Sequence, residues 1–241
     1  MFLFKKNKIH IDCFTCDETI AQDNPIQKTS NFIPEWWKKM PNSFHQMQNN
    51  VEVPFGTMKS CLGFIDLYSK GLVIPLWSDL NIKVEKNNIN YVIAKNTNLF
   101  GNSIEFHDRV QYGNSHNNHI HFKLISPWYL KEKSGVKFLL TSCIWNMLEN
   151  FPKIHIVNGI LEFSKLFITN INGFMSLENQ PYQYNIEIGM PLVQLIPLSE
   201  KSVVPHIQVL NDAEWKKMNH STVTNKFTGW GIYKSKLKNR K

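Results

Sequence analysis

The sequence predicts a mainly β fold, a barrel or sandwich of short antiparallel strands with a few short helices, mostly N-terminal. Three observations support this prediction. Apolar and polar residues alternate with a period of two in several segments after residue 71. These segments are short and are separated by Gly, Asn and Pro turns. A helical period is clear only before residue 71. At 241 residues and 42% hydrophobic, the chain can bury a substantial core.

The N-terminal part, about residues 1–71, begins with a predicted strand at Phe2–Ile11. A short helix is expected between Pro34 and Pro41, because proline suits a helix start and stops its continuation. Trp36 and Trp37 are adjacent and cannot both face one side of so short a helix. We therefore expect one to be buried and the other to be half-exposed or to meet a partner protein.

Thr57–Lys70 is the clearest predicted helix, with Thr57 as its N-cap and Gly71 just after its end. Its apolar residues recur on one face of a 3.6-residue period. They are Met58, Cys61, Leu62, Ile65 and Tyr68.

Strands dominate after residue 71, and alternation is strongest over 80–84, 120–124 and 182–188. Such strands have one face on the core and one in water. Further predicted strands include 90–94, 103–110, 136–140, 153–157, 159–168 and Pro191–Pro197, and a short helix is expected at Asp212–Met218. No linker divides the chain, so residues 1–233 are predicted to form one domain followed by a basic tail at 234–241.

The net charge of +8 lies at the two ends of the sequence. Residues 234–241 carry five Lys or Arg and residues 1–8 carry three Lys, with no acid in either segment, so residues 9–233 are formally neutral. Arginine, which reads bases and phosphates in a bidentate manner, occurs only twice. Sequence-specific DNA binding is therefore not expected. The Lys-rich C-terminal tail is predicted to make at most a weak, salt-sensitive contact with nucleic acid or an acidic protein.

No segment approaches the ~18 apolar residues of a membrane-spanning helix. The first apolar residues precede Lys5 and Lys6, whereas a secretory signal has the reverse order, so we expect an intracellular protein. Cys13 and Cys16 have the spacing of half a zinc site, but no second such pair follows. Two reduced thiols in a hairpin or loop are expected, with a zinc site completed by another Cys or His as the alternative.

Three glycine-anchored motifs lie between residues 133 and 197: Lys133-Ser134-Gly135, Gly159-Ile160-Leu161-Glu162 and Gly189-Met190-Pro191-Leu192-Val193-Gln194-Leu195. In order and spacing they resemble motifs of the trimeric deoxyuridine triphosphatases and deoxycytidine deaminases, which have a β-clip fold. The resemblance implies a β-clip-like architecture. It also implies a site in which Glu162 is the base and Lys133, Ser134, Gly135 and Gln194 hold a nucleotide with magnesium.

The chain departs from that family at three chemically important positions. Lys133 stands where the family has arginine, Pro191 where it has a second arginine, and Phe163 where a tyrosine stacks on the base. Phosphate hydrolysis needs those charges and that geometry. The motifs therefore predict the architecture rather than the reaction.

The longer pattern over residues 33–197 also resembles a poorly characterised family of bacteria and tailed phages, for which no activity is implied. Its landmarks here are Pro34-Glu35-Trp36, Thr57–Cys61, Gly71–Leu76, Pro127-Trp128 and Gly189–Pro197. That resemblance predicts a phage-type protein located in the host cytoplasm or the virion.

A histidine-rich segment offers a third hypothesis. His119 and His121, two residues apart on one strand face, satisfy half of a cupin-like metal motif. The expected glutamate is missing, because Ile125 and Ser126 stand there, and a wet sheet face shared with Lys123 explains the pair equally well.

The sequence thus favours a non-catalytic, β-clip-like binding or assembly protein of viral type. Its partner would be another protein or a second copy, contacted through Trp36 or Trp37. A nucleotide-binding or nucleotide-hydrolysing enzyme is the first alternative, and a cupin-like metalloprotein is the second.

Overall fold

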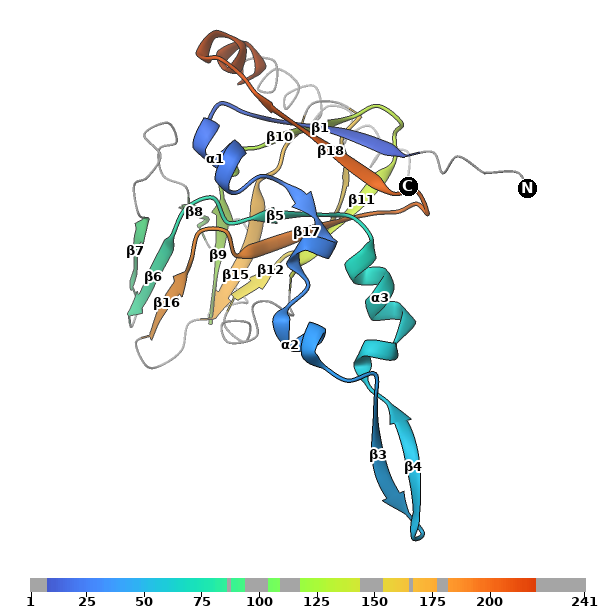
Figure 1. The fold of residues 1–241 in the computed structure, drawn as a ribbon. Helices are drawn as coiled ribbons and strands as arrows, with labels where there is room; N and C mark the ends of the chain where they lie inside the picture. Colours follow the sequence, from blue (N-terminus) through green and yellow to red (C-terminus); the bar gives the residue numbers. More distant parts are fainter. Residues whose placement is uncertain are drawn as a thin grey trace, which may run out of the picture.

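The computed structural model describes residues 8–85, 88–93, 104–108, 118–143, 154–164, 167–176 and 182–219. Over these residues the protein is mainly β, and its short helices lie mostly in the N-terminal part, as predicted (Figure 1). The helices are α1 (Glu18–Asp23), η1 (Thr29–Phe32), α2 (Glu35–Lys39), η2 (Met58–Ser60) and α3 (Leu62–Ser69). A further helix occupies residues 212–219, where one was predicted. The strands are β1 (Ile9–Thr15), β2 (Gln27–Lys28), β3 (Ser43–Gln48), β4 (Val51–Gly56), β5 (Leu72–Pro75), β6 (Leu80–Glu85), β7 (Asn88–Ile93), β8 (Ile104–Phe106), β9 (His119–Leu124), β10 (Tyr129–Glu132), β11 (Lys137–Ser142), β12 (Ile154–Ile156), β13 (Gly159–Glu162), β14 (Phe167–Ile168), β15 (Ile171–Ser176), β16 (Tyr182–Ile186), β17 (Pro191–Pro197) and β18 (Val203–Val209).

The described strands form five sheets. Their strand orders are β14-β10-β1-β18, β13-β11-β17-β5-β2, β12-β15-β9-β8, β16-β6-β7 and β3-β4. Within these residues every pairing is antiparallel except that of β1 with β18, and no sheet closes on itself. The antiparallel prediction is therefore confirmed, whereas the described strands form open sheets instead of a closed barrel.

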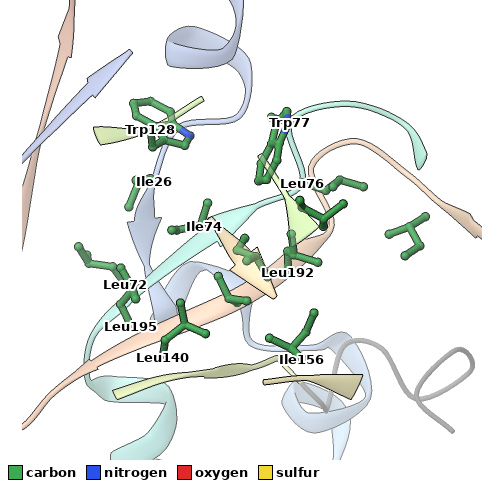
Figure 2. Packing of buried hydrophobic residues seen from close by; sticks show 14 of the residues in the cluster. Ile26, Leu72, Ile74, Leu76, Trp77, Trp128, Leu140, Ile156, Leu192 and Leu195 are labelled. Atoms are coloured by element: carbon green, nitrogen blue, oxygen red, sulfur yellow. The ribbon is translucent and has the colours of Figure 1, made fainter. Parts of the chain in front are cut away.

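Four of the sheets surround a common hydrophobic core. Figure 2 shows side chains from β5, β17, β11 and β12 meeting there, together with Trp77 and Trp128, which are 2% and 0% exposed. β17 lies between β11 and β5 and has four consecutive buried residues, Leu192–Leu195. A strand covered on both faces needs such a continuous run instead of alternation.

The parallel pair β1–β18 joins two distant parts of the sequence. In β1, Ile9, Ile11 and Cys13 point into the core, and His10 and Asp12 lie on the opposite face. Successive side chains of a strand point to opposite faces, which is why core and outer residues alternate along β1. β18 is the edge strand of its sheet, which is where a strand tolerates a proline such as Pro205.

Residues 34–70, which we call the arm, contain α2, the β3–β4 hairpin, η2 and α3. Figure 1 shows the hairpin extending away from the other sheets. The base of the arm is held internally. Trp37 packs against Phe64 and Tyr68 at ring-centroid distances of 5.5 and 5.2 Å, and Lys59 Nζ donates to the carbonyl of Lys38 at 2.8 Å.

The predicted helix over Thr57–Lys70 is divided in two. Thr57 caps η2, and the chain leaves helical geometry at Cys61 before α3 begins. Gly71 adopts φ +85, as expected for a residue that ends a helix. The prediction that the apolar face of this helix is buried is wrong for most of its residues. Tyr68 is buried, but Leu62 is 77% exposed and Ile65 45% exposed.

Strand predictions were most accurate where burial is complete. β17 coincides with the predicted Pro191–Pro197. The N-terminal strand covers Ile9–Thr15 within the described residues, and residues 2–7 of the prediction lie outside them. The strands that were not predicted are β2, β3, β4, β5, β10, β15 and β18. The predicted tail at 234–241 lies outside the described residues. In the part of the chain that the structure covers, no helix is long and apolar enough to cross a membrane.

Candidate functional site

The loop Lys133-Ser134-Gly135 folds around a carboxylate of its own chain. Glu132, at the end of β10, is 1% exposed and accepts backbone N–H groups from Ser134 at 2.5 Å, Gly135 at 2.9 Å and Val136 at 3.2 Å. Gly135 adopts φ +74, a conformation that favours glycine. The N–H groups that would hold a phosphate are therefore already bonded to Glu132.

Gln194, predicted to hold a nucleotide, instead fixes α3 to β17. Its side chain is 4% exposed, and its amide nitrogen lies 2.7 Å from the carbonyl of Leu67, 3.1 Å from that of Lys70 and 3.2 Å from Thr29 Oγ1. An amide nitrogen has two hydrogens. These contacts use both, so the role of Gln194 in this structure is structural.

Glu162, the predicted base, is the last residue of β13. It is exposed, pairs in register with Lys137, and accepts a hydrogen bond from Ser164 Oγ at 2.7 Å. The described residues include a surface cleft of about 430 Å³ that Lys133 and Ser134 line with Glu132, but neither Glu162 nor Gln194 lines it. The structure thus brings Lys133 and Ser134 together without the base and amide that nucleotide hydrolysis would require.

His119 and His121 lie on β9, as predicted. The His121 ring is 4.5 Å from that of His107 and 5.0 Å from that of Phe174, measured between centroids. Burial, then the neighbouring His107 and Lys123, lowers the pKa of His121, which favours a neutral imidazole. Among the residues that the structure describes, no group of three His, Cys, Asp or Glu side chains is placed to hold a metal ion. A cupin-like centre would need further ligands.

The four cysteines are free thiols. Cys13 is buried in β1 and Cys16 is half-buried just after it. Burial raises the pKa of Cys13 and raises that of Cys16 to about 11. Both side chains are therefore protonated thiols near neutral pH. This agrees with the prediction of reduced thiols in a hairpin or loop, since Cys13 lies in β1 and Cys16 lies in the loop that follows it.

The two tryptophans divide as the sequence analysis expected. Trp37 is 6% exposed and Trp36 is 36% exposed, with the two rings edge to face at 5.8 Å. Trp37 is buried against other residues of the arm rather than in the main core. Trp36 is the member of the pair that is available for a contact.

Apolar exposure is concentrated in the arm. Of the twelve large hydrophobic side chains that are exposed in the described part of the chain, seven belong to residues 34–70. They are Trp36, Phe44, Met47, Val51, Met58, Leu62 and Ile65. Concentrated exposed apolar surface of this kind marks binding sites on soluble proteins.

The β3–β4 hairpin is specified by its own sequence. Asn49 and Asn50 adopt φ 50 and 62 at the turn, which asparagine tolerates better than most residues. Phe44 and Phe55 pair across the strands with ring centroids 5.7 Å apart. All six residues of β3 are exposed, so the hairpin contributes nothing to the core.

No protein-family model matches the chain, and no curated protein shows significant similarity to it. The resemblances drawn from short motifs accordingly stay predictions.

Two features were not predicted from the sequence, and only the first has a sequence signal. Val51, Val53 and Phe55 alternate with polar or turn residues after Asn49-Asn50, which is the pattern of a hairpin. The second feature is a contact between His10 and His206, whose rings share a hydrogen bond across 196 residues of sequence. No local pattern could have indicated that pairing.

Proposed function

We propose that this chain is a non-catalytic assembly protein whose arm binds a second copy of the same chain. The observation that carries the proposal is the concentration of exposed apolar side chains on the arm. Leu62 and Ile65 on α3 and Met47 and Val51 beside the hairpin turn are between 45% and 77% exposed. Burying them against another subunit would gain about 25 cal/mol for each Å² removed from water.

The hairpin itself supports an intermolecular role. An isolated two-stranded hairpin is only marginally stable in water, and β3 and β4 both have an unpaired edge in the described structure. Contact with a further surface would therefore stabilise the hairpin. Its base is well anchored, since Thr57 Oγ1 donates to the carbonyl of Pro41 at 2.6 Å, so the arm presents the hairpin in a defined direction.

A second copy is the partner that best fits the composition of this surface. Glu52 is the only Asp, Glu, Lys or Arg between Ser43 and Gly56, so the hairpin has little charge with which to select a charged partner. Most soluble oligomers are homo-oligomers, and exchange of an identical element between protomers has a low free-energy cost.

The test is the mass of the protein in solution with one substitution on the arm and a matched one elsewhere. Leu62→Lys changes a side chain that is 77% exposed on α3, and Ile160→Lys changes one that is 64% exposed on β13. Exposed substitutions of this kind change the free energy of unfolding by about 0.5 kcal/mol or less. Sedimentation equilibrium should show an oligomer for the wild type and for Ile160→Lys, and a monomer for Leu62→Lys.

A wild type that stays monomeric at its highest soluble concentration would contradict self-association. Equal oligomer masses for Leu62→Lys and Ile160→Lys would exclude α3 as the interface. In the second case the same comparison with Met47→Lys tests the hairpin.

The nucleotide hypothesis keeps one supporting observation, the cleft lined by Lys133 and Ser134. It is tested by thermal unfolding with deoxynucleotides, with and without magnesium, because a ligand that binds only the folded state raises the unfolding temperature. An increase that is lost in Lys133→Ala would favour it over a purely structural role for the loop.

The phage-type assignment rests on the sequence resemblance alone. Within the proposal it corresponds to a virion-associated or accessory protein that assembles with itself. Binding of nucleic acid or an acidic protein by the tail at 234–241 is a separate prediction, because that segment is outside the described residues.

A further inference from the structure

His10 and His206 face one another across the only parallel strand pair in the described structure. His10 Nδ1 lies 2.8 Å from His206 Nε2. The rings are inclined by 16° with centroids 5.1 Å apart. Such a short nitrogen separation at this centroid distance places the rings edge to edge, joined through these two nitrogens.

Backbone register holds the two side chains in this arrangement. In the pairing of β1 with β18, His10 is opposite Val204 and Asp12 is opposite His206. The two histidines therefore lie diagonally on the outer face of the sheet, away from the core residues Ile9 and Ile11. Both are exposed, so their rings can adjust without disturbing packing.

The pair borders the cleft of about 430 Å³ described above. Lys8 and Lys133 supply two positive charges to its wall, and Asp12 and Glu132 supply two negative ones. Glu132 is already bonded to backbone N–H groups of the neighbouring loop. Asp12 Oδ1 accepts from Gln208 Nε2 at 3.2 Å. The formal charges balance, and the open cleft leaves room for water beside the two rings.

We propose that His10 Nδ1 and His206 Nε2 together bind one divalent transition-metal ion of the zinc, nickel or copper class. Neutral imidazole is the common protein ligand for these ions. The described residues contain no group of three ligating side chains, so the ion has two protein ligands here and water completes its coordination.

Binding requires a local rearrangement of the two rings. Two ligands at 2.0–2.1 Å on a tetrahedral ion lie about 3.3 Å apart, so the facing nitrogens separate by roughly 0.5 Å from their present distance. Each ring also turns by roughly 35°, so that its lone pair points at the ion and not at the other nitrogen. The ring that donates the hydrogen bond changes tautomer and places its proton on the other nitrogen. Each ring then presents a lone pair, and no net proton is released.

This site is independent of the proposed assembly function and differs from the predicted pair His119 and His121. The experiment uses full-length protein without a histidine tag, stripped of metal by a chelator and titrated with Cu²⁺ and with Zn²⁺. Copper binding is followed by electron paramagnetic resonance, which reports coordinated nitrogen, and zinc binding by the rise in unfolding temperature. The variants are His10→Gln, His206→Gln and, as the matched control, the double variant His119→Gln/His121→Gln.

The expected result is one bound ion per chain with two nitrogen ligands in the wild type and in the control variant. Both signals should be lost in His10→Gln and in His206→Gln. Unfolding temperatures measured without metal establish that each variant is folded. Retention of the signals in His206→Gln, loss of them in the control variant, or no stoichiometric binding by the wild type would each overturn the proposal.

Discussion

The sheets around the main core and the arm differ in where their side chains find partners. In the sheets, β17 is buried on both faces. Even the buried carboxylate of Glu132 accepts hydrogen bonds from nearby backbone N–H groups. In the arm, a small cluster around Trp37 holds the base, and most other apolar side chains face solvent. The comparison shows that the sheets bury their apolar side chains against one another, whereas the arm carries apolar surface that the described part of the chain does not cover.

The strongest test of this difference truncates one phenylalanine in each region. Phe138 on β11 is 0% exposed and packs against Phe163, and Phe44 on β3 is 47% exposed. Phe138→Ala should lower the free energy of unfolding by about 3–5 kcal/mol, because it leaves a cavity. Phe44→Ala should lower it by about 0.5 kcal/mol or less in the monomer. Urea unfolding monitored by circular dichroism measures both, and equal losses would contradict the division into a self-sufficient core and an uncovered arm.

A second test concerns the polar interior. Glu132→Gln leaves a single carbonyl oxygen where three backbone N–H groups converge, and should lower the free energy of unfolding by about 2 kcal/mol. Glu162→Gln is the control, since that carboxylate is exposed and accepts only from Ser164 among the hydrogen bonds described here. The control should change the free energy by about 0.5 kcal/mol or less. If Glu162→Gln lowered the free energy of unfolding more than Glu132→Gln, the structural role given to Glu132 would be wrong.

The smallest expected effect is a difference in reactivity between the exposed thiol of the arm and the buried thiols. Cys61 in the arm is exposed, whereas Cys13 and Cys143 are buried. Burial raises the pKa of Cys143 to about 12 and also raises that of Cys13. At pH 8 a thiol reagent should therefore modify Cys61 in the native protein and reach Cys13 and Cys143 only after unfolding.

The pH dependence has a definite sign. Thiols of the unfolded chain ionise near pH 8.5, whereas the buried ones stay protonated, so the free energy of unfolding should fall as pH rises above about 8.5 towards 12. Fast native labelling that persists in the double variant Cys16→Ser/Cys61→Ser, which keeps only the two buried thiols, would show that a buried thiol is accessible.

Much of the fold could be predicted because it depends on local periodicity. β17 and the alternating strands followed from apolar patterns that burial requires. The arm could not be predicted in the same way. The residues Leu62 and Ile65 have the spacing of a buried helical face, but periodicity cannot tell a core from a surface that faces another molecule.

The surroundings of the candidate nucleotide residues could not be predicted, for a different physical reason. Lys133–Gly135 forms a tight loop after β10, and no pattern in the sequence indicates that Glu132 turns its carboxylate into that loop. Likewise, the buried position of Gln194 depends on α3 packing over β17, a contact between segments 124 residues or more apart.

The parallel pairing of β1 with β18 also constrains how the protein is made. His10 and His206 are 196 residues apart, and a ribosome needs roughly 10–40 s to translate that length at 5–20 residues per second. During this time β1 has one edge that β10 can cover and another whose partner in the described structure, β18, has not yet been synthesised. Completion of this sheet is therefore a late step, in which the last described strand pairs with the first one.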